Sequence, residues 1–187
     1  MSEIIYYLAA SLDGFIATPD GGVEWLAEFE APGKDFGYSD FYQSIDALFM
    51  GRRTYEQVLS FGEWPYPGKP SWIFSRRPLA ISTPDITLAD KNPKELLPEL
   101  EKQDLHRFWL VGGASLAASF RAQGLINEMI ITIMPVILGG GIPIFDPEGP
   151  RERLALLDSK KFENDIMQLH YGKVNFAKQS PFVHGAS

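Results

Sequence analysis

Apolar and polar positions alternate along the chain in blocks that predict strands and helices in turn. Short apolar runs that end at a glycine or polar turn predict buried strands. They cover residues 4–10, 47–50, 72–74, 86–88, 108–111 and 129–134. Apolar residues at helical spacing predict helices between them. These cover residues 23–30, 38–44, 55–59, 93–100 and 114–123.

Local signals sharpen some boundaries. Asn92 and Pro93 are typical of an N-cap and a first helical residue, so Pro98 either distorts that helix or marks its true start. Gly124 is suited to end the helix before it. A last strand pair is predicted within residues 161–178, with Met167, Leu169 and Tyr171 on one face and Gly172 as a turn or bulge.

This order of elements predicts an α/β fold. Strands that alternate with helices favour a mostly parallel central sheet with helices on both faces, and the closing strands favour an antiparallel C-terminal hairpin. The chain of 187 residues shows no internal repeat or linker. We predict one domain over residues 1–178 and a disordered tail over 179–187.

Composition excludes several functions. A net charge of -7 disfavours nucleic-acid binding, which needs clustered basic residues. The chain has no cysteine and three scattered histidines, which disfavours disulfides and a metal site and favours the cytoplasm. The N-terminus lacks the features of a signal peptide, and no apolar run reaches membrane-spanning length, so we expect no membrane contact.

The first strand runs into the sequence SLDGFIA, residues 11–17. An Asp-Gly pair is typical of a tight hairpin turn, so a plain hairpin is one interpretation. The other is a loop that leaves the carboxyl edge of the sheet and covers a ligand, with Asp13 on it.

Two later segments, MGRRTYEQVL and LVGGASLAASF, each place glycine between a buried strand and a helix. Glycine can simply end a strand tightly. The same layout also binds phosphate, because the first amides of a helix lack internal partners and glycine allows close approach. Four arginines follow two strand ends, Arg52 and Arg53 after one, Arg76 and Arg77 after the next, which favours a phosphate-rich ligand. No GxGxxG follows the first strand, which disfavours an ordinary Rossmann domain.

The order of SLDGFIA, GGVEW, LFMGRRTYEQVL, PYPGKPSWIFSRR, FWLVGGASLAASF and EMIITIMPVILGGGIPIF resembles the dihydrofolate reductase-like superfamily. Within it, the chain is most similar to stand-alone proteins that resemble the reductase domain of the bacterial bifunctional riboflavin deaminase-reductase. The resemblance covers residues 4–176 and implies that superfamily's three-layer fold, with NADPH bound across the carboxyl edge of the sheet.

The resemblance also implies which residues bind the cofactor. Two glycine turns would hold the phosphates, a Ser-Arg pair would flank the adenine and its 2′-phosphate, and the first loop would lie beside the nicotinamide. The residues so assigned are Ala10, Ile16, Ala17, Gly51, Arg52, Arg53, Thr54, Ser75, Arg76, Val111, Gly112, Gly113, Ala114, Ser115 and Leu116. In dihydrofolate reductases the corresponding Gly-Gly bond is cis.

Candidate catalytic residues are Asp13 and Glu28. Asp13 would orient the substrate or help to supply a proton, which requires a pKa raised by burial. Dihydrofolate reductases carry a carboxylate on the helix after the first loop, for which Glu24, Glu28 and Glu30 are candidates here, and Glu28 shares a face with Trp25. Phe15, Trp25 and Phe29 are candidates for stacking on a substrate ring, together with Trp64.

The resemblance implies an NADPH-dependent reductase of a small pyrimidine-like or pterin-like substrate. The most similar activity is 5-amino-6-(5-phosphoribosylamino)uracil reductase, but such enzymes usually carry a basic residue where this chain has Phe15. Dihydrofolate reduction is an alternative, and an NADPH-binding sensor or interaction protein without efficient turnover is another. The superfamily often forms homodimers, and here the exposed C-terminal strands would make the contact.

Overall fold

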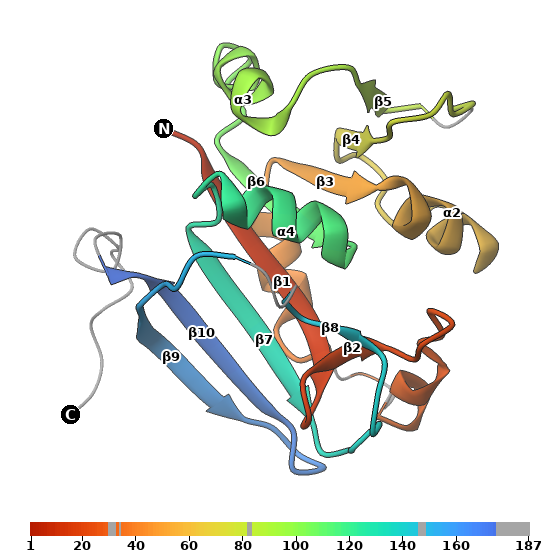
Figure 1. Cartoon of the computed structure of the whole chain (residues 1–187), viewed down its shortest axis with the longest axis vertical. Helices are drawn as coiled ribbons and strands as arrows, with labels where there is room; N and C mark the ends of the chain where they lie inside the picture. Colours follow the sequence, from red (N-terminus) through yellow and green to blue (C-terminus); the bar gives the residue numbers. More distant parts are fainter. Residues whose placement is uncertain (30–32, 34, 82–83, 146–148, 175–187) are drawn as a thin grey trace. The chain divides into compact units, whose positions relative to one another are not determined.

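The computed structural model describes residues 1–29, 33, 35–81, 84–145 and 149–174 (Figure 1). Among these residues, eight strands form one sheet in the order β5-β4-β3-β6-β1-β7-β10-β9, and β2 and β8 form a second, two-stranded sheet. The strands are β1 (Glu3–Ser11), β2 (Phe15–Ala17), β3 (Ala47–Gly51), β4 (Ser71–Phe74), β5 (Ile86–Ala89), β6 (Arg107–Gly112), β7 (Glu128–Met134), β8 (Ile142–Pro143), β9 (Leu154–Lys161) and β10 (Met167–Lys173). The helices are the 3₁₀ helix η1 (Glu24–Phe29) and the α-helices α1 (Tyr38–Ser44), α2 (Arg52–Ser60), α3 (Pro93–Glu101) and α4 (Ala114–Ala122).

The chain forms two compact units. Unit 1 comprises Met1–Tyr6 and Gly37–Ile126, and unit 2 comprises Tyr7–Phe36 and Asn127–Ser187. The prediction of a single domain over residues 1–178 stays a prediction, and the predicted tail at 179–187 lies outside the described residues. In the part of the chain that the structure describes, no helix has the length and apolar character needed to cross a membrane.

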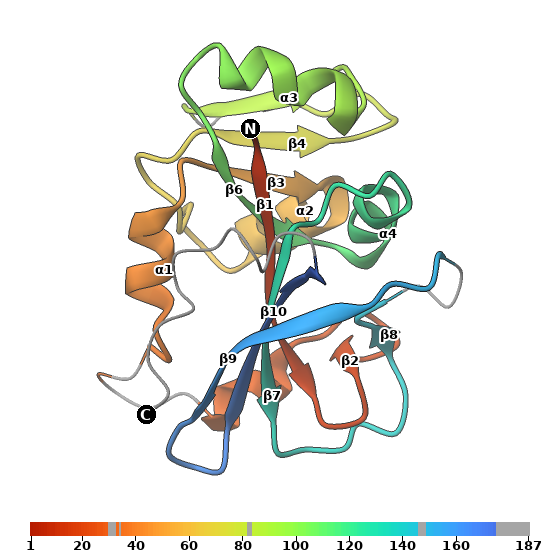
Figure 2. The same cartoon turned by 90° about the vertical axis from the view of Figure 1, so that its left-hand side faces the viewer.

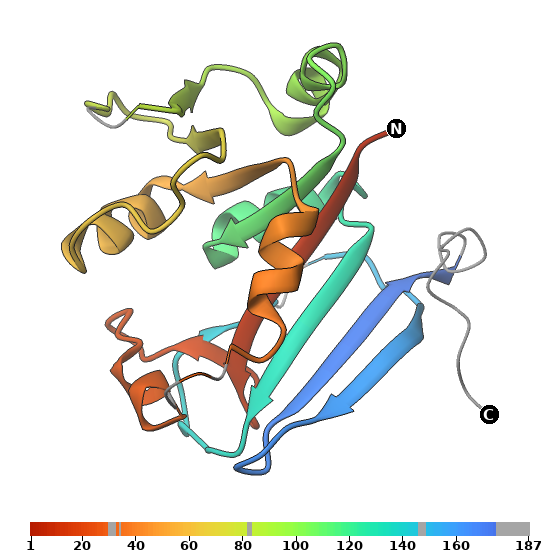
Figure 3. The ribbon, with the colours of Figure 1, turned by 180° about the vertical axis from the view of Figure 1, so that it is seen from behind.

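Unit 1 has three layers, as predicted for an α/β fold. Strands β5, β4, β3 and β6 and the first half of β1 pair in parallel. Helix α4 covers one face of this sheet (Figure 1). Its Phe120 packs on Phe49 and Phe74. Helix α1 covers the opposite face (Figure 3). Its rings Tyr38 and Phe41 contact Trp109. Tyr55 of α2 packs on Met50 and Ile73, which are fully buried. Because side chains alternate between the two faces along each strand, both faces of the sheet present apolar residues for helices to pack on.

Unit 2 contains the antiparallel part of the sheet. Strand β10 pairs with β7 on one side and with β9 on the other (Figure 2), which confirms the C-terminal hairpin. The short strands β2 and β8 pair antiparallel in a separate sheet.

Several boundaries differ from the sequence predictions. Helix α2 begins at Arg52, directly after the strand, so residues predicted as a turn form its first helical turn. Asn92 does accept a hydrogen bond from the amide of Glu95, and the helix that begins at Pro93 continues through Pro98. The predicted helix at 23–30 is a 3₁₀ helix that ends at Phe29.

The last strand pair was placed too far along the chain. Strand β9 begins at Leu154, and β10 ends at Lys173. Gly172 is neither a turn nor the bulge: it pairs with Glu128 and Ala155, and the register shift lies between His170 and Tyr171. The predicted residues 175–178 lie outside the described residues.

Candidate functional site

The two glycine turns of unit 1 lie side by side. They follow β3 and β6, which are parallel neighbours with Met50 opposite Gly112. Strand β4 pairs with the other edge of β3 and places Phe74 opposite Gly51. The segments 51–54, 75–77 and 112–116 therefore leave the same carboxyl edge of three adjacent strands, which is where open α/β sheets bind ligands.

Both turns lead directly into helices that lack a side-chain cap. Gly51 is the N-cap of α2 and Gly113 the N-cap of α4, and neither helix start has a side-chain capping bond. Helix α3, by contrast, is capped by Asn92. The first amides of α2 and α4 are thus available to an anion at the positive ends of two helix dipoles.

Glycine keeps these turns close together. A Cβ atom on Gly113 would lie 3.1 Å from Thr54 Oγ1, and one on Gly51 would lie 3.5 Å from Gly112 O and Gly113 N. The peptide bond between Gly112 and Gly113 is cis, as the resemblance implied. The residues that line the two turns therefore suit a phosphate-bearing group that must approach the backbone.

The arginines beside the turns differ in their contacts and exposure. Arg52 Nε donates to Glu56 Oε1 at 2.7 Å, one helical turn along α2. Arg53, Arg76 and Arg77 have exposed side chains. Ser75 Oγ accepts from the Arg77 amide at 3.2 Å and donates to the Arg77 carbonyl at 2.7 Å, which shapes the turn after β4.

The remaining predicted residues of this region are Val111, Ala114, Ser115 and Leu116. Val111 ends the apolar part of β6, and the other three form the first turn of α4, where Ser115 is exposed and the other two are half-buried. Their assignment to a cofactor stays a prediction.

In unit 2, the segment SLDGFIA is not a plain hairpin. The Gly14 amide donates to the Ser11 carbonyl at 3.0 Å, so a tight turn is present and Gly14 has a φ of 86°. The strand that follows, β2, pairs with β8, whose residues lie over a hundred positions further along the chain. The segment is therefore a loop that leaves the main sheet, and its role in covering a ligand stays a prediction.

Asp13 joins this loop to the one after β7. Its Oδ1 accepts from Ser11 Oγ at 2.7 Å and from the Leu138 amide at 3.1 Å, and its Oδ2 accepts from the Gly139 amide at 2.8 Å. Ser11 is buried, and its Oγ accepts from the Phe15 amide at 2.9 Å. Neither Ser11 nor residues 138–139 were predicted from the sequence as members of the site.

These hydrogen bonds, led by that from Ser11, lower the pKa of Asp13. The carboxyl group is exposed, so the burial required of an acid is absent. Because the folded-state pKa lies below the ordinary value, the bonds persist at neutral pH and are lost only as the pH falls through the lowered pKa. The proposed role of Asp13 in supplying a proton therefore finds no support in its environment.

The other predicted residues of unit 2 lie on β1, β2 and η1. Ala10 and Ala17 are buried, and Ile16 is half-buried. Phe15, Trp25 and Phe29 are half-buried, and Trp25 Nε1 is a buried donor without a hydrogen-bond partner among the described residues. Glu24 and Glu28 are exposed on η1, and Glu30 lies outside the described residues. A catalytic role for Glu28 stays a prediction.

The covered face of the unit 2 sheet carries unexpected polar groups. Gln168 Nε2 donates to Thr132 Oγ1 at 3.0 Å and to the Phe36 carbonyl at 3.3 Å. The Tyr7 hydroxyl bonds to the same two side chains, while burial, with a smaller contribution from the charge of Asp35, raises its pKa. These groups satisfy one another, so they stabilise the packing of β1, β7 and β10.

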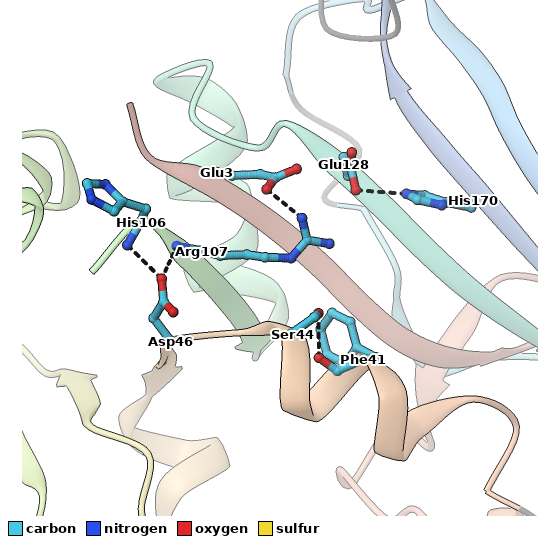
Figure 4. A network of polar contacts seen from close by, with 8 residues as sticks. All are labelled: Glu3, Phe41, Ser44, Asp46, His106, Arg107, Glu128 and His170. Carbon is cyan, nitrogen blue, oxygen red and sulfur yellow. Dashed lines mark hydrogen bonds and ion pairs between the residues drawn. The ribbon is translucent and has the colours of Figure 1, made fainter. Parts of the chain in front are cut away.

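Hydrogen bonds between ionisable side chains also join neighbouring strands (Figure 4). In unit 2, Glu128 is buried and bonds to His170 Nε2 at 2.8 Å. In unit 1, Arg107 Nη1 pairs with Glu3 at 2.5 Å, and the backbone amides of His106 and Arg107 donate to Asp46 at 2.8 Å. No group of three or more potential metal ligands occurs among the described residues.

Comparisons with known proteins agree with this fold. The chain is 39% identical over 170 residues to the Bacillus subtilis protein YwjB, covering 90% of this chain and 97% of that one. The crystal structure of a putative riboflavin biosynthesis protein from Shewanella sp. PV-4 matches this fold with a TM-score of 0.84 at 29% sequence identity. The match covers 92% of this chain and 99% of that one.

A bifunctional protein of Thermotoga maritima, a diaminohydroxyphosphoribosylaminopyrimidine deaminase/5-amino-6-(5-phosphoribosylamino)uracil reductase, shares the fold. Its TM-score is 0.69 at 15% identity, and 92% of this chain covers 56% of it. The family model of the RibD C-terminal domain matches residues 2–168. The chain therefore belongs to the RibD C-terminal domain family.

Proposed function

We propose that the protein is an oxidoreductase that uses NADPH to transfer a hydride to a small heterocyclic substrate. The observation that carries this proposal is the pair of adjacent, uncapped helix starts at Gly51 and Gly113. Two such ends, with exposed arginines beside them, suit a ligand with several phosphates better than a monophosphate. Membership of the RibD C-terminal domain family supports the same chemistry.

The cofactor would supply the hydride, so the protein has to bind, orient and shield the reactants. The amides at the starts of α2 and α4 would hold the pyrophosphate, and Arg76 with Ser75 would recognise the 2′-phosphate. Arg52 already bonds to Glu56 through Nε, which leaves its two Nη groups for a phosphate.

For the substrate, we propose a pyrimidine-like or pterin-like ring. The T. maritima protein is named for reduction of a phosphoribosylaminouracil, and this activity is the most similar named one. Phe15 lies half-buried in β2 where the riboflavin-type reductases usually have a basic residue, which argues against a phosphorylated ribosyl group at that position.

Calorimetric titration with NADPH and NADH tests the cofactor. We expect NADPH to bind more tightly, and Arg76→Ala to weaken NADPH about tenfold, with little change for NADH, because one charge-assisted contact is lost. Arg151→Ala is the control, since Arg151 is exposed and lies outside these turns. If wild-type protein binds neither nucleotide, the proposal is wrong. Tight binding without consumption across a panel of pyrimidines and pterins would instead support the sensor alternative.

We also propose that the protein is a homodimer through the sheet of unit 2. Side chains of paired residues in an antiparallel ladder lie on the same face. Tyr171 pairs with Leu156 and Met129, Leu169 with Ile131, and Met167 with Ile133, so this face is apolar across β7 and β10 and at Leu156. On β9 it also carries Ser159 and Lys161. Leu156 and Met167 are 54% and 36% exposed, and β9 is the last strand in the sheet order. Two copies of one apolar patch beside an open edge suit a two-fold contact.

Sedimentation velocity tests the dimer. We expect wild-type protein to sediment as a dimer and Leu156→Glu to shift it towards monomer, because a carboxylate cannot be buried in an apolar contact without a partner. Leu59→Glu is the control, since Leu59 is also partly exposed but lies on α2. A monomeric wild-type protein at micromolar concentration would contradict the proposal.

A further inference from the structure

The first turn of helix α2 carries charges that oppose the stability of the helix. Arg52 and Arg53 occupy its first two positions, no acidic residue lies in that turn, and Gly51 makes no side-chain capping bond. The start of a helix is the positive end of its dipole, where acidic residues stabilise and basic residues destabilise. Helix α3 has the stabilising arrangement, with Asn92 as its cap and Glu95 in its first turn. The start of α2 therefore keeps an excess of positive charge.

One carboxylate contacts this turn, and it comes from the next turn of the same helix. Arg52 Nε donates to Glu56 Oε1 at 2.7 Å. The order of the pair is the less favourable one, because an acidic residue stabilises a helix more when it precedes its basic partner. The two side chains are 35% and 47% exposed, and a pair this exposed adds little to stability. Helix stability therefore does not explain the pair.

The hydrogen bond fixes one side of the guanidinium and leaves the rest of it open. Nε carries one of the five N–H donors, and the two Nη groups carry the others. Side chains on a helix lean towards its N-terminus, so Glu56 reaches back to Arg52. Arg52 is itself the first helical residue, so the same lean carries its side chain towards the uncapped helix start. The free Nη groups form the fork that binds a phosphate through two oxygens.

We propose that Glu56 is a positioning residue of the cofactor site, which holds the Arg52 guanidinium so that its Nη groups meet a phosphate at the start of α2. The inference rests on the proposed function, because it takes a phosphate-bearing ligand at this turn. Arg52, Glu56 and the turn all belong to unit 1. Glu56 acts through Arg52 and touches no phosphate itself. Its charge repels the ligand, but the side chain is nearly half exposed, so water and salt screen that repulsion.

Calorimetry on the full-length protein with inorganic pyrophosphate, 2′,5′-ADP and NADPH tests this role. We expect Glu56→Ala to weaken each probe about fivefold, because the guanidinium then has to be ordered when the ligand binds. Glu56→Gln should stay within about twofold of wild type, since its side-chain oxygen still accepts from Nε. An effect of charge alone would instead tighten binding in both variants. Glu99→Ala is the matched control and should change no affinity, because Glu99 is also 47% exposed and pairs with Lys91, but lies on α3.

A double-mutant cycle separates positioning from a general effect on the helix. In the Arg52→Ala background, Glu56→Ala should change the affinity for 2′,5′-ADP by less than about 1.5-fold, because no guanidinium is left to hold. NMR of the Arg52 Nε–H gives a readout without ligand, and this hydrogen should exchange with water faster in Glu56→Ala than in wild-type protein. Unchanged or tighter binding by Glu56→Ala, an equal loss in the Arg52→Ala background or unchanged exchange would overturn the role.

The three probes also separate this role from the proposed function. If wild-type protein binds pyrophosphate and 2′,5′-ADP with the expected differences among variants, but does not bind NADPH, the proposed function is wrong and the role of Glu56 stands. If it binds NADPH and the Glu56 variants bind as tightly, the role is wrong and the proposed function stands. If it binds none of the three, both are wrong.

Discussion

Replacing Gly141 by alanine is expected to destabilise the protein more than any other glycine substitution in its loop. A Cβ atom on Gly141 would lie 2.1 Å from the carbonyl oxygen of Ala17, and the residue has a φ of 153°, which L side chains rarely adopt. Neither backbone can give way easily, because Ala17 pairs with Ile142 in the two-stranded sheet. We expect a loss of about 3 kcal/mol or more in the free energy of unfolding, measured by urea denaturation.

The neighbouring glycine provides a matched control. A Cβ atom on Gly140 would meet nothing within 4 Å, and its φ lies outside the range that disfavours other residues. Gly140→Ala should therefore change the free energy of unfolding by less than about 0.5 kcal/mol. Similar losses for the two variants would contradict the close approach of the two loops, since both remove the same kind of residue from adjacent positions.

The pairing of those two loops could not be predicted from the sequence, whereas other elements could. The strand, glycine and helix at residues 47–60 could be predicted, because an apolar run followed by an amphipathic helix is a local pattern. The partner of β2 could not, since β2 and β8 are three and two residues long and pair across more than a hundred positions. Strands this short do not contain enough residues to show a hydrophobic alternation.

The candidate site also has one part that could be predicted from the sequence and one part that could not. Glycine at a strand end and arginine beside it are signals that a sequence displays, and the turns at residues 51 and 113 lie together as parallel neighbouring strands require. The bonds of Asp13 go to backbone amides, which every residue except proline carries, so no residue type at positions 138 and 139 could have indicated them. Glycine at 139 indicates only a loop.

The prediction of the C-terminal strands was wrong for another reason. Residues 154–161 mix apolar and charged side chains, and a register shift between His170 and Tyr171 breaks the alternation that would have identified the pair. The two faces also depart from a simple pattern. Glu128, Thr132, Gln168 and His170 occupy the covered face, while Leu156 and Met167 lie on the partly exposed face. A rule that places every apolar side chain inwards would misplace these residues.

The polar residues of the covered face lead to the second large effect, which we expect from His170→Ala. Glu128 is 2% exposed, and its hydrogen bond to His170 Nε2 is 2.8 Å long. Removal of the imidazole leaves a buried carboxylate without that partner, which is costly in a poorly solvated site. We expect a loss of about 2 kcal/mol in the free energy of unfolding at neutral pH, less than for a fully buried pair because the His170 side chain is 20% exposed.

A second histidine of the chain supplies the comparison. His106 pairs with Asp104 at 3.2 Å, but these side chains are 46% and 99% exposed, so His106→Ala should cost less than about 0.5 kcal/mol. His170→Gln should recover part of the stability lost in His170→Ala, because its amide can still donate to Glu128. If His170→Ala and His106→Ala lose the same stability, the pair adds little to the stability of the sheet. If His170→Gln also fails to recover stability, the packing of the imidazole ring matters more than its hydrogen bond.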